Sequence, residues 1–199
     1  HDALPICGNL IILCGHFKGI DYGNFDPNYD LVGFKKLYSY WDSGFEDKGW
    51  LAIFLANHDQ PRMVSHWGND APEFRAASSK MLTTFIMTMR GTPYYYYGDE
   101  LGMTNIKFDN IENYRDIETL NKYAQAKKNG DDFAKFIEDK KRSARDNGRT
   151  PFQWDSRANA GFSIGTPWLK INQNYKTVNA AAEESDANSC LNYFRKIVK

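Results

Sequence analysis

The sequence has no excess of charge of either sign. Its 25 Lys and Arg residues balance 25 Asp and Glu residues, so the formal net charge is zero. Nucleic acids and anionic membranes bind proteins mainly through an excess of positive charge, which this chain lacks. No apolar stretch approaches the ~20 residues that a membrane-spanning helix needs. We therefore expect no nucleic acid and no membrane among its partners.

Cysteine is scarce, and several sequence signals are missing. The three cysteines, Cys7, Cys14 and Cys190, match no metal-binding spacing and leave one thiol unpaired, so no disulfide framework is expected. There is no glycosylation sequon and no signal-peptide pattern, and the chain begins with His1 instead of an initiator methionine. We expect a cytoplasmic protein and a chain that begins inside a larger one.

Hydrophobic residues are plentiful and arranged in alternating patterns. They make up 42% of the 199 residues, which is enough for a sizeable core. Three apolar runs have the length of strands: Leu10–Cys14, Trp50–Ala56 and Tyr94–Tyr97. Apolar residues recur at helical spacing between them, at Leu31, Phe34, Tyr38, Trp41 and Phe45 and at Phe74, Ala77, Met81, Phe85 and Met89. The alternation predicts a parallel α/β sheet covered by helices, followed by further helices at Asp131–Lys141 and around Leu191–Val198.

Polar residues follow the second and third apolar runs directly. Asn57-His58-Asp59-Gln60-Pro61-Arg62 ends the second run, and Asp99 and Glu100 follow the third. In parallel α/β folds the carboxyl ends of the strands face the ligand crevice, so these side chains are candidates for a binding or catalytic site. The structural alternative is that Asp59 only forms an ion pair with Arg62.

Other kinds of site fit the sequence less well. Neighbouring strand residues point to opposite faces and no third ligand stands at a familiar spacing, so His58 and Asp59 predict no metal site. No glycine-rich phosphate loop follows a strand, which argues against nucleotide binding. Residues 161–165 match the G-x-S-x-G of serine hydrolases, but loop-like residues precede them and Pro167 follows, so Ser163 is interpreted as a loop residue.

Three blocks of sequence resemble a known family when they are taken together and in order. FLANHDQPRMVSHWGND resembles the fourth signature region of the α-amylase superfamily of retaining glycosidases, in the form typical of the oligo-1,6-glucosidase and α-glucosidase branch. GTPYYYYGDELGMTN resembles the eighth barrel strand of that branch, and SARDNGRTPFQWDSRANAGFSIGTPWLKINQNY resembles the loop after it. The resemblance covers nearly everything from about Asp21 to Lys199.

The resemblance implies an α/β fold that is the C-terminal portion of a (β/α)8 TIM barrel, from about strand six to helix eight. Leu10–Cys14, Trp50–Ala56 and Tyr94–Tyr97 would be strands six, seven and eight. Residues 1–199 would form a partial catalytic barrel, with 101–175 as the long loop region after strand eight. The family's C-terminal β-domain would be absent.

The resemblance also implies roles for three side chains. The family's counterpart of Asp59 is a catalytic residue that stabilises the oxocarbenium-like transition state through hydrogen bonds to sugar hydroxyls. The counterpart of His58 contacts the same sugar, and that of Arg149 binds hydroxyls of the non-reducing glucose. The nucleophile and the general acid follow strands four and five in the family, and no residue here matches them. This chain by itself is therefore predicted to be inactive.

The implied activity is hydrolysis of α-1,6 or α-1,4 glucosidic bonds, or both, at the non-reducing end of short oligosaccharides, with retention. The complete enzyme would be a cytoplasmic monomer without a cofactor. One alternative is a sucrose isomerase or transglycosylase on the same barrel, but residues 16–22 lack the arginine-rich motif of the isomerases. The other is a non-catalytic carbohydrate-binding relative. Near the start the family reads Phe-Glu-His where this chain has Cys14-Gly15-His16, so residues 1–15 differ from the pattern.

Overall fold

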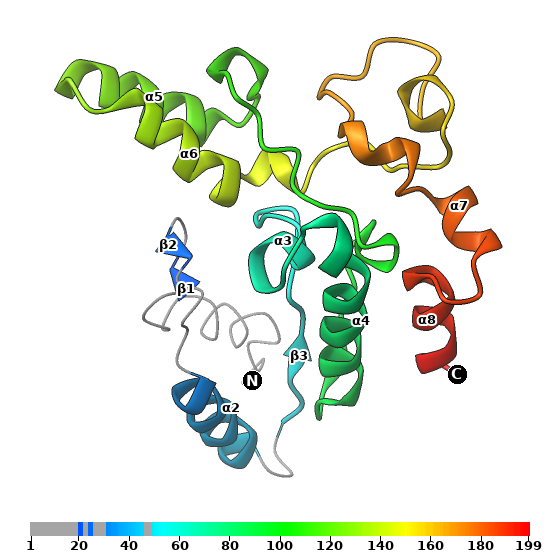
Figure 1. Cartoon of the computed structure of the whole chain (residues 1–199). Helices are drawn as coiled ribbons and strands as arrows, with labels where there is room; N and C mark the ends of the chain where they lie inside the picture. The colour runs from blue at the N-terminus through cyan, green and yellow to red at the C-terminus, as the bar shows by residue number, and fades with distance from the viewer. Residues whose placement is uncertain (1–19, 22–23, 26–30, 46–48) are drawn as a thin grey trace, which may run out of the picture.

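The computed structural model describes residues 20–21, 24–25, 31–45 and 49–199 (Figure 1). Its strands are β1 (Ile20–Asp21), β2 (Asn24–Phe25), β3 (Ala52–Ile53) and β4 (Thr92–Pro93). Its α-helices are α2 (Leu31–Phe45), α3 (Met63–Trp67), α4 (Pro72–Thr88), α5 (Ile117–Asn129), α6 (Phe133–Ser143), α7 (Ala180–Ser185) and α8 (Cys190–Ile197). Short 3-10 helices lie at Asp99–Leu101, Ile111–Asn113, Arg145–Asn147, Ala158–Gly161 and Gln173–Lys176.

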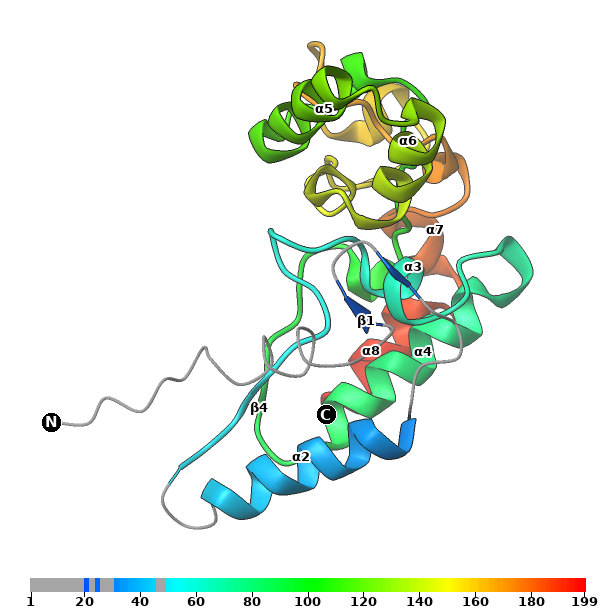
Figure 2. The same ribbon diagram turned by 90° about the vertical axis from the view of Figure 1, so that its left-hand side faces the viewer.

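The centre of the fold is the parallel pair of β3 and β4, which α4 connects. Ala52 pairs with Thr92 and Ile53 with Pro93, and the two strands run side by side in Figure 2. A Cβ atom at Gly91 would lie 2.6 Å from the Ile53 side chain, so this approach of the two segments requires glycine. The predicted parallel strand–helix–strand unit is confirmed here.

The predicted bounds of the strands are wrong. Only two residues of the Trp50–Ala56 run are bonded as strand, and the third strand is Thr92–Pro93 instead of Tyr94–Tyr97. The tyrosines follow the strand because the chain turns there, with the Asp99 amide donating to the Tyr96 carbonyl over 3.1 Å. The first predicted strand, Leu10–Cys14, lies outside the described residues.

An apolar core lies between β3 and the helices α2 and α4. It is built from Phe34, Leu51, Ile53, Leu55, Ala56, Met63, Trp67, Leu82 and Ile86. The rings of Phe34 and Phe85, one from each helix, lie 5.6 Å apart. The two helices expected from the apolar spacing are therefore confirmed, and their inward faces hold the β3–β4 pair in place.

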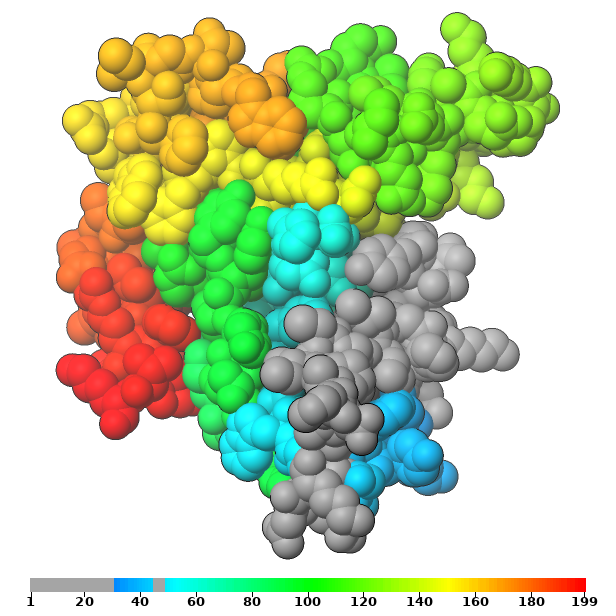
Figure 3. All heavy atoms as spheres, turned by 180° about the vertical axis from the view of Figure 1, so that it is seen from behind, coloured from blue at the N-terminus to red at the C-terminus, as the bar shows by residue number. Residues whose placement is uncertain are grey.

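A polar layer of residues 101–175 covers the end of the molecule to which β3 and β4 lead. In the space-filling view it extends across the whole upper side, from green through yellow to orange (Figure 3). The helix predicted at Asp131–Lys141 is present as α6, and α5 pairs with it as a helical hairpin. Asp116 and Asp132 cap the two helices through their carboxylates, and Gly130 ends α5 at a φ of +75°. The apolar spacing of the sequence does not predict α5.

The C-terminal helix α8 packs along α4 (Figure 1). Thr84 and Tyr193 share a hydrogen bond of 2.6 Å between their hydroxyl groups, and Arg75 forms an ion pair of 3.1 Å with Glu183. The predicted helix around Leu191 is confirmed, although Val198 lies just beyond its end. No helix in the described part of the chain has the length and apolar character that crossing a membrane requires.

Candidate active site

The polar run after β3 forms a tight turn. The Asp59 amide donates to the Asn57 side chain over 2.8 Å, and the Gln60 amide donates to the Asn57 carbonyl over 3.1 Å. Asparagine side chains commonly close turns in this way. The turn lifts the Asp59 carboxylate out of the core, and its side chain is 46% exposed. The apolar run therefore ends abruptly because its last residues deliver a carboxylate to the surface of a cavity.

Two arginines from the polar layer hold one oxygen of Asp59. Arg145 Nη1 lies 3.2 Å and Arg149 Nη2 3.0 Å from the same atom, Oδ1. Arg149 also donates from Nε to the His58 carbonyl over 2.7 Å. The second carboxylate oxygen, Oδ2, lies 3.3 Å from Nε2 of His58. The three residues selected from the sequence, His58, Asp59 and Arg149, are thus in contact, and Oδ2 has capacity to accept a hydrogen bond from a ligand.

The alternative ion pair between Asp59 and Arg62 is wrong. Arg62 is fully buried and points the other way, where its guanidinium donates to the main-chain carbonyls of Tyr97, Asn147 and Thr150. Its Nη1 lies 2.5 Å from the Tyr97 oxygen. A guanidinium with its donors fixed in one plane suits this task, because three carbonyls from two segments converge on it. Arg62 therefore connects the polar layer to the turn that follows β4.

Two carboxylates at the start of α5, the cap residue Asp116 and Glu118 of the first turn, support the arginines, and sequence reasoning missed them. Asp116, at 3% exposed, lies 2.6 Å from Arg145 Nη2 and 3.5 Å from Arg149 Nη1, and Glu118 lies 3.4 Å from Arg145. Burial by itself raises the pKa of Asp116, but hydrogen bonds from Arg145 and Thr119 outweigh it and lower the pKa below its usual value. The only sequence signal for this arrangement is the cap pattern that begins α5 at Asp116.

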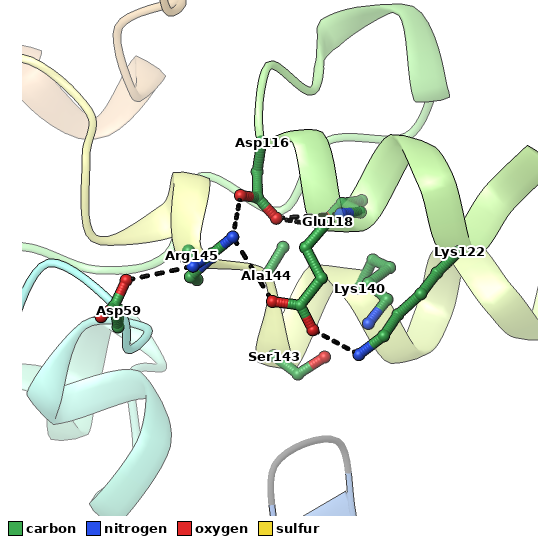
Figure 4. Close-up of a pocket in the computed structure, with 9 residues that line it drawn as sticks. Asp59, Asp116, Glu118, Lys122, Lys140, Ser143, Ala144 and Arg145 are labelled. Carbon is green, nitrogen blue, oxygen red and sulfur yellow. Dashed lines mark hydrogen bonds and ion pairs between the residues drawn. The ribbon is translucent and has the colours of Figure 1, made fainter.

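A cavity of about 320 Å³ opens between the Asp59 turn and the helices α5 and α6. Figure 4 shows Arg145 at its centre, bonded to Asp59 on one side and to Asp116 and Glu118 on the other. The α5–α6 hairpin adds Lys122 and Lys140 to the wall. The cavity thus offers carboxylate oxygens and cationic donors together, the chemistry that binds polyhydroxylated ligands.

The remaining sequence candidates lie outside this cavity. Asp99 is 3% exposed and is buried behind Arg62, and burial raises its pKa to about 7. The Glu100 carboxylate accepts the Gly98 amide over 2.7 Å, which is a structural role. Ser163 lies in an exposed loop, where its hydroxyl accepts the Gly165 amide over 3.0 Å, so residues 161–165 are not a nucleophile elbow.

The chain matches one protein family and many of its members. Residues 17–199 match the family model for the α-amylase catalytic domain. An oligo-1,6-glucosidase of Parageobacillus thermoglucosidasius is 47% identical over 172 residues, covering 86% of this chain and 30% of the relative. A trehalose-6-phosphate hydrolase of Bacillus subtilis (strain 168) is 43% identical over 192 residues, covering 92% of this chain and 34% of the relative.

Solved structures agree with the sequence matches. The trehalose-6-phosphate hydrolase of Bacillus licheniformis superposes with a TM-score of 0.85 at 43% identity, covering 93% of this chain and 33% of that one. An isomaltulose synthase variant of Erwinia rhapontici NX5 superposes with a TM-score of 0.84 at 42% identity, covering 96% and 34%. This chain spans about a third of the length of such relatives. It belongs to the α-amylase catalytic domain family.

Proposed function

We propose that residues 1–199 are the C-terminal part, from about strand six to helix eight, of a TIM-barrel glycosidase. The complete domain hydrolyses α-1,6 or α-1,4 glucosidic bonds, or both, at the non-reducing end of short oligosaccharides, with retention. Support comes from family membership and from the names of the matched relatives, which include oligo-1,6-glucosidases and an α-glucosidase of Pediococcus pentosaceus. A monomeric, cytoplasmic enzyme remains a prediction.

The observation that carries the proposal is the asymmetric hold on Asp59. Arg145 and Arg149 both bind Oδ1, which fixes the orientation of the carboxylate and leaves Oδ2 for a ligand. A sugar hydroxyl that donates to Oδ2 becomes more acidic as positive charge develops on the ring, so the hydrogen bond strengthens toward the transition state. Asp59 in this mechanism stabilises the oxocarbenium-like state.

His58 and Arg149 bind the terminal glucose in this mechanism. His58 lies beside Oδ2 with its side chain 74% exposed, so its ring is accessible to the sugar that Asp59 binds. Arg149 uses Nε and Nη2 on His58 and Asp59. Both contacts belong to the same turn, and they keep the arginine fork beside the sugar.

The covalent step requires two more carboxyl groups. A retaining glycosidase uses a nucleophile and a general acid ~5–5.5 Å apart. Asp116 is engaged by Arg145 and by two donors of Thr119, so it is not free to attack a sugar. We assign the nucleophile and the acid to strands four and five of the complete barrel.

The test is the stereochemistry of the product formed by the complete catalytic domain. Proton NMR during hydrolysis of an aryl α-glucoside should first show the α-anomer of glucose. A β-anomer, or no turnover of aryl α-glucosides, isomaltose and maltose, would contradict the proposal.

A second candidate function is sucrose isomerisation, because isomaltulose and trehalulose synthases are among the structural neighbours. The same domain incubated with sucrose distinguishes the two. A hydrolase releases glucose and fructose, whereas an isomerase yields a rearranged disaccharide as its main product.

A further inference from the structure

Arg62 lies just after Asp59 in the chain, and it binds the segment that carries the two arginine partners of Asp59. Its Nε donates to the Asn147 carbonyl over 3.2 Å, and its Nη2 lies 3.2 Å from both the carbonyl and the hydroxyl oxygen of Thr150. Asn147 precedes Arg149 in the chain, and Thr150 follows it directly. The guanidinium therefore binds the main chain on both sides of Arg149.

Arg62 is itself fixed in place. Its amide donates to the Asn105 side chain over 2.9 Å, and its own side chain is fully buried. Its guanidinium carbon lies 4.7 Å from the centre of the Tyr97 ring. Each hydrogen bond between the guanidinium and the described residues goes to a neutral oxygen. A buried charge is tolerated only where hydrogen bonds replace its water, so the guanidinium holds these oxygens in one arrangement.

The segment that Arg62 binds lies directly against the Asp59 turn. A Cβ atom at Gly148 would collide with the main-chain oxygen of Gln60, so this approach leaves no room for a side chain. The main chain from which both arginine partners of Asp59 extend is therefore fixed relative to the turn.

The orientation of the Asp59 carboxylate depends on those two arginines. Arg145 Nη1 lies 3.2 Å and Arg149 Nη2 3.0 Å from Oδ1, while the Asp59 side chain is 46% exposed. These distances are near the upper end of the range for hydrogen bonds, so a shift of ~1 Å in the segment would break both contacts. A misplacement of ~1 Å in an active site can cost about 10²-fold in rate.

We propose that Arg62 is a positioning residue of the glycosidase, which holds Arg145 and Arg149 where they orient the Asp59 carboxylate. Arg62 is buried away from the cavity surface and acts only through these arginines. The inference rests on the proposed glucosidase function. It adds a buried residue to those that determine the rate of hydrolysis.

The experiment is a double-mutant cycle in the complete catalytic domain, with kcat/KM for an aryl α-glucoside as the measured quantity. Arg62→Lys keeps the positive charge but cannot bind three carbonyls in one plane. It should lower kcat/KM by ~10-fold or more. In the Asp59→Asn background the same change should lower kcat/KM by less than ~3-fold, because the carboxylate that Arg62 helps to orient is gone.

Arg75→Lys is the matched control. Arg75 is 15% exposed and also binds main-chain carbonyls, those of Leu101 over 2.6 Å and Gly102 over 3.2 Å. Neither carbonyl belongs to the Asp59 turn or to residues 145–150. The control should lower the melting temperature and leave kcat/KM unchanged.

Two results would overturn the role of Arg62. They are an Arg62→Lys enzyme that is less stable but has a normal kcat/KM, and a loss of equal size in both Asp59 backgrounds. If Arg62→Lys does not fold, Tyr97→Phe takes its place in the cycle. The Tyr97 hydroxyl lies 3.1 Å from the Gly148 carbonyl oxygen and 2.9 Å from that of Thr150, so its removal loosens the same segment. A loss that adds fully to that of Asp59→Asn would again overturn the role.

If the wild-type domain does not turn over aryl α-glucosides, the proposed function fails instead. Amide hydrogen exchange then tests Arg62 by itself. Residues 145–150 should exchange faster in Arg62→Lys than in the wild type or in Arg75→Lys. Unchanged exchange in this segment would show that Arg62 does not position it.

Discussion

At the scale of single residues, the surroundings of Asp59 indicate whether it is a structural ion-pair partner or a catalytic group. It has two arginine partners, Arg145 and Arg149, yet both use the same oxygen and the side chain stays 46% exposed. Exposed ion pairs contribute little to stability, typically 0–1 kcal/mol. The arrangement therefore orients the carboxylate more than it stabilises the fold.

We predict that Asp59→Asn in the complete catalytic domain lowers kcat by a factor of order 10² to 10⁴, with a much smaller change in KM. The asparagine side chain keeps the size of the aspartate but lacks the negative charge that stabilises the oxocarbenium-like transition state. Steady-state kinetics and a thermal melt on one preparation measure the kinetic constants and the stability of the variant together. Asp109→Asn, which removes an exposed carboxylate paired with Lys141, is the matched control. A destabilised Asp59→Asn enzyme with normal kcat would reverse the assignment.

Arg149→Lys should reduce kcat/KM on α-1,6-linked and α-1,4-linked substrates by similar factors. A lysine cannot reproduce the planar contact in which Nε binds the His58 carbonyl and Nη2 binds Asp59. The sugar held there is the terminal glucose, which both kinds of substrate share. Isomaltose and maltose assayed side by side supply the measurement, and a loss confined to one linkage would move Arg149 to another subsite.

The partners of Asp59 are a residue-scale feature that the sequence does not disclose. Arg145 lies 86 positions away and Arg149 lies 90 positions away, and no local pattern reports contacts of that separation. The resemblance suggested Arg149 because this residue lies within one of the sequence blocks that resemble the family. Arg145 stood in the same quoted block without an assigned role.

At the scale of elements, helices were more predictable than strands. Apolar spacing located α2, α4 and α8 because each carries apolar residues at the helical period, although Leu31, Phe74 and Met81 of that pattern are exposed. The approximate positions of the two strands were predicted, but their first and last residues were not. Hydrogen bonds with the partner strand decide where a strand ends. The helix α5 was missed because it is mainly polar, although Asp116 before it and Gly130 after it are recognised start and stop signals.

The turn after β4 should give the domain a distinctive pH dependence through Asp99. Burial raises its pKa from 3.8 to about 7, so the folded state keeps a proton that the unfolded chain releases. Its contribution is fully present below pH 3.8 and is lost as pH rises through about 7. Relative to Asp99→Asn, the wild-type free energy of unfolding should fall by up to about 1.4 kcal/mol per pH unit in that window. Denaturant unfolding of both forms at pH 4.5 to 7.5 measures it, and a pH-independent difference would contradict it.

At the scale of the whole molecule, the described chain contains one parallel pair of two-residue strands beneath a large polar layer. Large apolar side chains on its helices, including Leu31, Phe74 and Met81, are 51% exposed. Exposed apolar faces and open strand edges favour association between molecules. The relatives that it matches are about three times as long.

Residues 1–199 expressed alone should show no turnover of an aryl α-glucoside. Asp59 can stabilise a transition state only where a nucleophile and a general acid carry out the covalent step, and no residue here matches either of them. The isolated chain should also aggregate or melt without a sharp cooperative transition. A colorimetric assay, light scattering and a thermal melt test both statements. Measurable glucosidase activity would contradict the first statement, and a sharp melt of a monomer would contradict the second.

The buried Arg62 has a consequence for the order in which the chain folds. It joins carbonyls 35, 85 and 88 positions away, whereas the α5–α6 hairpin closes over only a few residues. Closing a long loop costs more entropy than closing a short one, and contacts between distant residues form slowly. We therefore expect the contacts of Arg62 to form later in folding than the local contacts of the α5–α6 hairpin.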